Sequence, residues 1–372
     1  MKFLIVTHVV HTKKGNDYSA YSPYVNEMNI WLRHVDSVTI IAPFRKKDVL
    51  ELQQNYISKS IHFIPVPQFS FTNFYESLRA LVVIPIVIWK LFRAMFSADH
   101  IHLRCPGNMG LLGVFVQIFF PTKNKSAKYA GNWDPKSTQP LSYQLQKAIL
   151  RNTFFTKKMQ VLVYGNWNNF TKNCTSFFTA TYSKTEALPV EEKKWEDKIK
   201  FVFVGSLVNG KQPIKAIQLI ESLMMNYPNV ELSIYGEGPE LANLNSYITK
   251  HSLQSKVLLK GILDKEALKK VYQNSHFLIL CSKSEGWPKV VAEAMFWGCL
   301  PIVSPVSCVP NMLDFGKRGI VLSNDINENR RLISNLIEDK TEYEKRRVAA
   351  LNWSREYTIE KFESEIINIL KP

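Results

Sequence analysis

The feature that most constrains the fold is a regular alternation of short apolar runs and amphipathic segments after residue 200. The apolar runs are FVFVG, VELSIYG, KVLLKG, HFLILCS and LPIVS, and the amphipathic segments lie at 213–225, from about 240, at 264–273 and at 288–297. Strands and helices that alternate at this spacing indicate βαβ units. The sequence therefore predicts a parallel sheet covered by helices on both faces.

The first half of the chain repeats this pattern more loosely, with KFLIVTHV, SVTIIAP, IHFIPVP, DHIHLRC and SAKYAG as candidate strands. A chain of 372 residues has room for about two domains. We therefore expect an α/β protein with two Rossmann-like domains, at 1–185 and 186–352. The charged segment 183–200 is the expected linker.

The last twenty residues, 353–372, are predicted to form a closing helix that packs back toward the N-terminal domain. Thr358 stands where an N-cap is expected, and Phe362, Ile366 and Ile367 form an apolar face at helical spacing.

Positive charge is concentrated in the first half of the chain. Residues 1–190 contain 22 Lys and Arg against 9 Asp and Glu, whereas the remainder contains 25 against 23. A basic field confined to one domain favours a polyanionic partner, such as a membrane surface, a lipid phosphate or a nucleic acid. A basic surface that serves only solubility is the alternative.

Composition and local patterns exclude several classes of protein. The 46% hydrophobic content argues against disorder, and five scattered cysteines without a CxxC pair argue against a disulfide scaffold and indicate reduced thiols in a cytosolic protein. The N-terminus resembles a first strand more than a signal peptide. The apolar segment 78–96 contains Arg79, Pro85, Lys90 and Arg93. It is therefore expected to fall short of the roughly 20 apolar residues that span a bilayer, and either to lie on an anionic membrane or to pack in the core.

The segment Ser284 to Ala294, SEGWPKVVAEA, follows an apolar run and contains the most informative polar pattern. Pro288 suits a first helical turn, so the free amides from Gly286 to Val290 are expected to form an anion site. Glu285 precedes this site and Glu293 follows it by about 7.5 Å along the helix. Two carboxylates that bracket a phosphate site could accept hydrogen bonds from hydroxyl groups, whereas an ordinary αβ unit with two solvated glutamates is the plainer interpretation.

This segment resembles the E-x7-E element of retaining family 4 glycosyltransferases of the GT-B fold, here written EGWPKVVAEAMFWGCLPIV. The resemblance is strong over residues 200–325 and thin before them. It implies a GT-B architecture, in which two Rossmann-like domains face each other across a cleft that holds the reaction. It also implies that Glu285 contacts donor-sugar hydroxyls, that Glu293 contacts ribose hydroxyls, and that amides near Gly286, Trp287, Pro288, Lys289 and Val290 hold the diphosphate.

An upstream segment, FVGSLVNGK, resembles the FVGRLxxxKG loop of the same family. By this resemblance Gly205 and Lys211 bind the donor, and Lys211 offsets charge on the leaving diphosphate. Ser206 stands where the family usually has an arginine, so one cationic contact is missing or comes from elsewhere. The loop also approaches a Walker A pattern, but Gln212 occupies the position of the required Ser or Thr. Gly236, in the turn YGEGP, matches a further family element.

The acceptor side is expected in the N-terminal domain. His8 and His11 follow the first strand, Arg104 follows the fourth, and Asn132 and Asp134 follow the fifth. Many relatives carry a histidine in this last loop, where Gly131, Asn132 and Trp133 stand here. We predict these five polar side chains on the acceptor side, although a structural role for each loop histidine remains open.

The sequence thus predicts a metal-independent retaining glycosyltransferase that needs no cofactor beyond its nucleotide diphosphate sugar. No Asp-x-Asp motif occurs in the chain. The expected acceptor is a glycan or a lipid-linked molecule, as in bacterial surface polysaccharide assembly. The expected location is the cytoplasm, with attachment to the inner face of the membrane. A non-catalytic sugar-nucleotide binder is the first alternative. A nucleic-acid-binding protein is the second, but no recognised module supports it.

Overall fold

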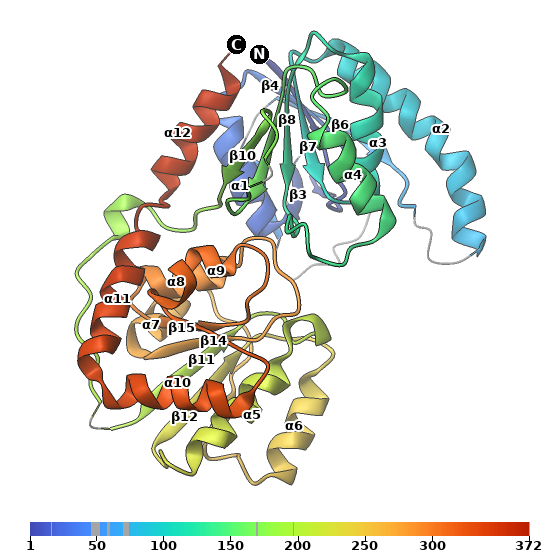
Figure 1. The fold of residues 1–372 in the computed structure, drawn as a ribbon. Helices are drawn as coiled ribbons and strands as arrows, with labels where there is room; N and C mark the ends of the chain where they lie inside the picture. Colours follow the sequence, from blue (N-terminus) through green and yellow to red (C-terminus); the bar gives the residue numbers. More distant parts are fainter. Residues whose placement is uncertain are drawn as a thin grey trace. The chain divides into compact units, whose positions relative to one another are not determined.

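The computed structural model describes residues 1–371 apart from 16, 46–52, 58–59, 70–73, 169 and 196. It divides into two compact units (Figure 1). The N-terminal unit comprises Met1–Phe177 together with Glu363–Pro372, and the C-terminal unit comprises Phe178–Phe362. The boundary in the structure therefore lies eight residues before the predicted residue 185.

The N-terminal unit is built on a seven-stranded sheet with the strand order β10-β9-β8-β7-β1-β4-β6. Every pair of neighbouring strands in this sheet is parallel. Its strands are β1 (Lys2–Val6), β4 (Ser37–Pro43), β6 (Ile61–Val66), β7 (His100–Cys105), β8 (Asn124–Tyr129), β9 (Met159–Tyr164) and β10 (Cys174–Phe177). The sequence predicted the first five of these strands but not β9 and β10.

Helices cover both faces of this sheet, as alternation along the strands requires. Leu4 and Val6 of β1 face a core shared with α2 (Phe74–Ser97) and α3 (Asn108–Val116). Phe3 points the other way and stacks on Trp31 of α1 (Ser22–Leu32), with ring centroids 5.8 Å apart. A further helix, α4 (Leu141–Arg151), packs against α3.

A small antiparallel sheet, absent from the sequence prediction, stands apart from the main one. It contains β2 (Thr12–Lys14), β3 (Asp17–Tyr21) and β5 (Gln53–Asn55), with β3 in the middle. The segment DYSAY contains two tyrosines but no hydrophobic run, so it carries no strong strand signal. Hydrogen bonds among Thr12, Ser19 and Gln53 connect the three strands through their side chains.

The C-terminal unit contains a six-stranded parallel sheet in the order β13-β12-β11-β14-β15-β16. Its strands are β11 (Ile199–Val204), β12 (Val230–Tyr235), β13 (Val257–Leu259), β14 (Phe277–Leu280), β15 (Leu300–Val303) and β16 (Ile320–Val321). Its helices are α5 (Pro213–Met224), α6 (Leu241–Lys250), α7 (Lys265–Asn274), α8 (Lys289–Phe296), α9 (Val309–Met312), α10 (Ile326–Glu338) and α11 (Lys340–Ser354). The five strands from β11 to β15 and the helices from α5 to α8 agree with the prediction.

The expected linker is instead part of the C-terminal unit. Trp195 packs edge-on against Tyr343 of α11, and the Lys193 ammonium donates to the Tyr272 and Gln273 carbonyls at the end of α7. The last helix, α12 (Ile359–Leu370), begins after Thr358, whose hydroxyl accepts the Lys361 amide.

The closing helix packs on the N-terminal unit through its later residues. Glu363 accepts hydrogen bonds from His34 and Arg33 at the end of α1. Phe362 and Ile366 are buried, whereas Ile367 is 37% exposed. The buried face therefore includes Phe362 and Ile366 but not Ile367, and it continues with Ile369 and Leu370.

Helix α2 departs from the expectation that no segment could span a bilayer. The part Ala80–Ser97 is long and apolar enough to cross a membrane by length and composition, and one third of it is buried inside the protein. This part contains only two charged residues, Lys90 and Arg93. Arg79 lies just before it.

Candidate functional site: a strand switch point in each unit

The sheet of the C-terminal unit reverses its strand order between β11 and β14. From β11 the order proceeds to β12 and β13 on one side, and from β14 to β15 and β16 on the other. Ligands of open parallel sheets bind at the carboxyl ends of the strands where this reversal occurs. The two segments with the clearest motifs, Gly205–Lys211 and Cys281–Pro288, directly follow β11 and β14.

Lys211 and Glu285 meet at this point. The Lys211 ammonium donates to a Glu285 carboxylate oxygen at 2.5 Å. The Glu285 side chain is only 8% exposed, whereas that of Lys211 is 29% exposed. Lys211 ends the short helix η3 (Asn209–Lys211), and Gln212 follows with a left-handed backbone before α5 begins at Pro213. The pair places one cation and one hydrogen-bond acceptor side by side at the switch point.

Glycines allow the loops after β11 and β12 to approach closely. A Cβ atom on Gly236, which has a φ of +148°, would lie 1.9 Å from the Gly205 carbonyl oxygen. The Gly205 amide in turn donates to the Tyr235 carbonyl at 3.0 Å. Only glycine fits this contact, so Gly236 shapes the loop that carries Lys211.

The predicted anion site lies at the start of α8, and this helix begins one residue later than the sequence suggested. Pro288 is the N-cap residue and the helix begins at Lys289, one position later than expected. The first amides of a helix have no intrahelical acceptor, so those of Lys289 and Val290 are available to an anion. The Gly286 carbonyl is held from behind by the Ser307 hydroxyl and the Cys308 thiol, each at 3.2 Å.

The Trp287 side chain belongs to an aromatic cluster. Its ring stacks on Trp353 at 6.1 Å and lies 5.5 Å from Tyr357, centroid to centroid. The sequence predicted Trp287 as a donor-binding residue. The structure gives its side chain a packing role that anchors the loop to the end of α11.

Glu293 lies in the second turn of α8, where its carboxylate accepts a hydrogen bond from the Thr181 hydroxyl at 2.7 Å. Burial raises the pKa of this carboxyl, although the Thr181 bond opposes the rise. Burial and the Glu293 charge also raise the pKa of Tyr272. The partners of Glu293 thus differ from those of Glu285, and the two glutamates form separate parts of the site.

A further cation, Lys283, is held beside the loop that carries Lys211. The Lys283 amide donates to the Gly210 carbonyl at 2.9 Å, and its ammonium donates to the Asn209 side chain. Ser206, which replaces the usual arginine, is exposed in the same loop. Sequence reasoning did not single out Lys283, because no motif position marks it.

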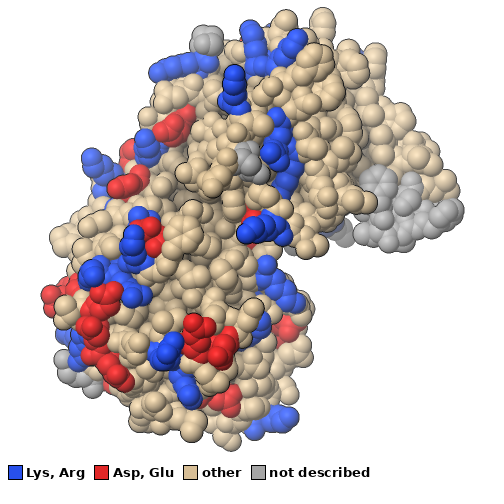
Figure 2. All heavy atoms as spheres, viewed as in Figure 1, with Lys and Arg blue, Asp and Glu red and all other residues tan. Residues whose placement is uncertain are grey.

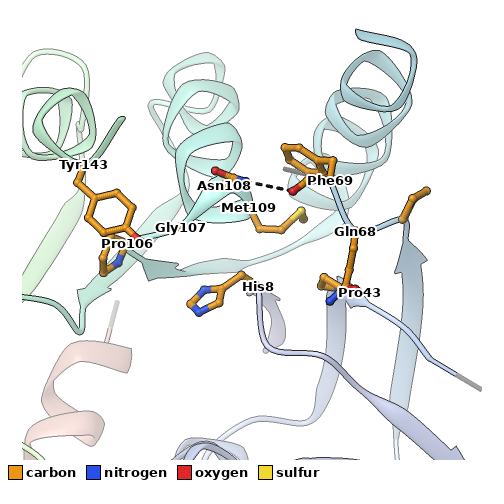
Figure 3. Close-up of a pocket in the computed structure, with 10 residues that line it drawn as sticks. His8, Pro43, Gln68, Phe69, Pro106, Gly107, Asn108, Met109 and Tyr143 are labelled. Carbon is orange, nitrogen blue, oxygen red and sulfur yellow. Dashed lines mark hydrogen bonds between the residues drawn. The ribbon is translucent and has the colours of Figure 1, made fainter. Parts of the chain in front are cut away.

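The N-terminal unit has its own switch point between β1 and β7, and a pocket of about 540 Å³ lies there (Figure 3). Its walls include His8 after β1, Gly107 and Asn108 after β7, and Tyr143 from α4. The side-chain amide of Asn108 donates a hydrogen bond to the Phe69 carbonyl across the pocket at 3.1 Å. The lining residues carry no Lys, Arg, Asp or Glu among the described part of the chain.

Of the predicted acceptor-side residues, His8 lines this pocket. A Cβ atom on Gly107 would lie 3.0 Å from His8 Nδ1, so this glycine leaves room for the ring. Desolvation by the surrounding protein, and then the Arg104 charge, lower the pKa of His8. The ring is therefore held toward its neutral form, which can both donate and accept a hydrogen bond.

His11 lies in the core instead of the pocket. Its side chain is fully buried, with Nδ1 2.8 Å from the Val9 carbonyl oxygen and Nε2 2.7 Å from the Tyr56 hydroxyl. A carbonyl only accepts, so Nδ1 donates and Nε2 accepts from Tyr56. Burial lowers the pKa of His11 to about 4. With both nitrogens occupied, His11 has a structural role here.

Arg104 is also removed from the pocket. It forms an ion pair with Glu27 of α1, and the Lys128 ammonium lies 3.0 Å from the other oxygen of the same carboxylate. All three residues are buried. Arg104 and Lys128, on the neighbouring strands β7 and β8, thus share the Glu27 carboxylate. Sequence reasoning missed Glu27 and Lys128 because neither belongs to a motif.

Asn132 and Asp134 organise their own loop after β8. The Asn132 side chain accepts the Asp134 amide at 2.9 Å, and the Asp134 carboxylate accepts the Lys136 amide at 2.8 Å. Such contacts are typical of Asx turns. Neither residue lines the pocket described above.

The C-terminal part of the chain is similar to a known family. Residues 184–353 match the family model described as "Glycosyl transferases group 1". Over 125 residues, 34% of this chain, the sequence is 28% identical to a phosphatidylinositol N-acetylglucosaminyltransferase of Arabidopsis thaliana. That match spans only 28% of the relative's own length.

Two solved structures share the complete fold. The lipopolysaccharide outer core galactosyltransferase WaaB is 14% identical, with a TM-score of 0.71 over 100% of this chain and 99% of its own. Anabaena HepE, solved in complex with UDP-glucose, is 12% identical, with a TM-score of 0.68 over 100% of this chain and 99% of its own. The chain therefore has the GT-B fold of these glycosyltransferase structures, and its residues 184–353 match the model of the group 1 glycosyl transferases.

Proposed function

We propose that the protein is a retaining glycosyltransferase that moves a sugar from a nucleotide diphosphate sugar to a lipid-linked or polysaccharide acceptor. The observation that carries this proposal is the Lys211–Glu285 contact at the switch point of the C-terminal unit, beside the start of α8. A sugar diphosphate needs a cation and helix amides for its phosphates and a hydrogen-bond acceptor for its sugar hydroxyls. Lys211, the start of α8 and Glu285 supply these three groups.

The diphosphate is proposed to bind at the amides of Lys289 and Val290 and to draw Lys211 toward it. Charge develops on the diphosphate as the bond to the sugar breaks, and preorganised donors stabilise that charge most strongly in the transition state. Lys283, held against Asn209 and Gly210, is the proposed second cation in place of the arginine that Ser206 replaces. These groups supply the stabilisation without a metal ion.

Glu285 is proposed to accept hydrogen bonds from hydroxyls of the donor sugar. In a retaining front-face reaction the departing phosphate takes the proton of the acceptor hydroxyl, so no side-chain base is assigned. Glu293 is proposed to accept hydrogen bonds from the ribose hydroxyls. The hydrogen bond that it accepts from the Thr181 hydroxyl is of the same kind.

The acceptor sugar is proposed to occupy the 540 Å³ pocket beside His8. Aromatic and amide walls suit a neutral sugar, because rings stack on its apolar faces and amides bind its hydroxyls. The pocket therefore selects the saccharide end of the acceptor. Any phosphate or lipid part lies outside it, over the basic surface. Assembly of bacterial surface polysaccharide is the process we propose.

A thermal-shift screen against UDP, GDP, ADP and CMP and their sugar conjugates tests the donor half of this proposal. A ligand at about 100 times its dissociation constant adds about 2.7 kcal/mol to the stability of the unit that it binds. We expect one base to stabilise the protein, and Glu293→Ala to remove the shift. Glu328→Ala, an exposed carboxylate in the first turn of α10, is the matched control and retains it.

Turnover separates an enzyme from a sugar-nucleotide binder. With the donor found by the screen, we expect hydrolysis of the sugar diphosphate or transfer to an added glycan, and loss of both in Glu285→Ala. Binding without turnover under any acceptor would establish the non-catalytic alternative. Transfer that survives in Glu285→Ala would refute the site assignment.

A further inference from the structure

Helix α2 is apolar on two opposite faces. Its inner face contains Val83, Val87 and Leu91, which are buried in the core of the N-terminal unit. Its outer face, defined here as the outer α2 face, is exposed and consists of Leu78, Leu81, Val82, Ile86, Trp89, Phe92 and Phe96. Leu81, Val82, Trp89 and Phe96 are each between 62% and 72% exposed. A soluble monomer rarely exposes a continuous apolar surface of this kind.

The apolar surface of the outer α2 face extends onto the short helix that follows α3. Figure 1 shows α2 beside α3, and the short helix η1 (Gln117–Phe119) directly follows α3. Phe119 is 72% exposed, and its ring centroid lies 6.5 Å from that of Phe92. The side-chain amide of Gln117 donates a hydrogen bond to the Phe155 carbonyl. Phe154 and Phe155 are themselves exposed.

Cationic side chains lie at the border of this apolar surface. Between residues 77 and 185 the sequence holds 14 Lys and Arg but only two acidic residues, Asp99 and Asp134, although Arg104, Lys125 and Lys128 are buried. Lys123 lies at the end of α2, where its ammonium donates to the Phe96 and Ala98 carbonyls. Lys157 lies over the Phe154 ring at 5.4 Å. On the face drawn in Figure 2, separate Lys and Arg side chains lie among uncharged residues on the N-terminal unit, and Asp and Glu lie along α12 and on the C-terminal unit beside further Lys and Arg.

The geometry distinguishes lying on a bilayer from crossing it. The inner face of α2 is tied into the sheet core, and Lys90 donates to the Pro65 carbonyl at 2.7 Å, so the helix cannot leave the unit without opening that core. A helix with one apolar face exposed and cations at its border is suited to the interface between headgroups and acyl chains. Exposed tryptophan favours the same depth.

We propose that the outer α2 face, together with Phe119, docks the N-terminal unit on the surface of a bilayer that contains anionic lipid. The apolar side chains enter the acyl boundary, and the neighbouring lysines and arginines contact the phosphates of the headgroups. Charge complementarity selects this occupant over a second copy of the chain, because two such basic surfaces repel each other.

Vesicle flotation of the full-length chain tests the proposal. We expect binding to vesicles of phosphatidylcholine mixed with phosphatidylglycerol, and at least tenfold weaker binding to phosphatidylcholine alone. High salt reduces the affinity, because it screens the cationic contribution. A Leu81→Glu, Trp89→Glu double variant should lose at least tenfold in affinity, and a single Lys157→Gln about fivefold.

The control is Met225→Glu, which alters a side chain that is 84% exposed on the C-terminal unit. It should bind vesicles as the unaltered chain does. Circular dichroism and thermal melting confirm that each variant is folded. The proposal is overturned if the double variant binds anionic vesicles normally, if the unaltered chain does not bind them, or if the outer face instead supports a dimer that the double variant dissociates.

This test is independent of the proposed transferase reaction. Vesicle binding requires neither donor nor Glu285, so the Glu285→Ala variant should still float with the vesicles. Failure of flotation with intact nucleotide binding would refute only the docking surface, whereas intact flotation without turnover would refute only the proposed reaction.

Discussion

The Lys211 ammonium lies 2.5 Å from a carboxylate oxygen of Glu285, although 74 positions separate the two residues in the chain. They meet because β11 and β14 are neighbours and each carries one of them in the following loop. The contact pairs a cation with a carboxylate at the switch point. In the proposed reaction, the donor diphosphate offers Lys211 a second anion and the Glu285 oxygens accept hydrogen bonds from sugar hydroxyls.

Lys211→Gln should lower kcat about 100-fold, because it removes a cation that faces the leaving diphosphate. Its effect on stability should be about 1 to 3 kcal/mol, because Lys211 is partly exposed but the Glu285 carboxylate that loses this donor is buried. Steady-state kinetics and thermal melting measure the two effects. Lys250→Gln, an exposed lysine at the end of α6, should leave both unchanged. A large loss of stability without a loss of kcat would show that the pair serves only the fold.

Lys283→Gln should lower kcat about tenfold if Lys283 replaces the cation that Ser206 lacks. Restoring the family pattern with Ser206→Arg in the Lys283→Gln background should then recover activity. The pair of variants is informative because a purely structural Lys283 would not be rescued by a charge in a different position of the loop. Kinetics with the identified donor provide the measurement.

Gly236→Ala should destabilise the C-terminal unit by more than about 2 kcal/mol, since a φ of +148° and a Cβ 1.9 Å from the Gly205 carbonyl both oppose a side chain. Gly210→Ala is the control, because a Cβ there meets nothing within 4 Å. Urea unfolding followed by tryptophan fluorescence compares the two. Equal stability would contradict the close approach of the loops.

Glu27→Gln should cost about 3 to 5 kcal/mol in the N-terminal unit, because it leaves Arg104 and Lys128 buried without their counter-charge. Glu363→Gln removes a carboxylate from the partly exposed contacts with Arg33 and His34 and should cost no more than about 1 kcal/mol. Thermal melting of the two variants should rank them in this order. Comparable melting temperatures would contradict a buried ion cluster.

Stability should fall as the pH is lowered from 7 to 5, because His11 is neutral in the folded protein. Its pKa falls from 6.5 to about 4 on burial, so the unfolded chain takes up a proton in the window between these values and the folded chain does not. The loss at pH 5 relative to pH 7 is about 2 kcal/mol from His11 alone.

The pKa values of His100 and His276 are also lowered to about 4 by burial and add to this dependence. In His11→Gln the melting temperature should change less steeply with pH than in the unaltered chain. If the melting temperature of His11→Gln depended on pH as steeply as that of the unaltered chain, the buried position of His11 would be contradicted.

The second half of the chain shows how much local patterning determines. The strands β11 to β15 and the helices α5 to α8 follow the sequence prediction within a few residues, because their apolar runs are buried on both faces and separated by clear turns. Glu285 and Glu293 could be singled out from the polar pattern that follows an apolar run, and Lys211 from the resemblance of its loop to a family element. The resemblance to the glycosyltransferase family was predicted from the same residues, and the match of a family model over residues 184–353 agrees with it.

Tertiary structure alone decided the roles of residues whose surroundings come from distant segments. His8 and His11 are three positions apart in one loop, yet His8 lines a pocket while His11 is enclosed by Tyr56. Arg104 forms an ion pair with Glu27, which comes from another element 77 positions away and which no motif marks. The two faces of α2 are equally apolar in sequence, and only packing against the sheet distinguishes the buried face from the exposed one. Periodicity reports that a side chain is apolar or charged, but its burial and partners depend on which elements the fold brings beside it.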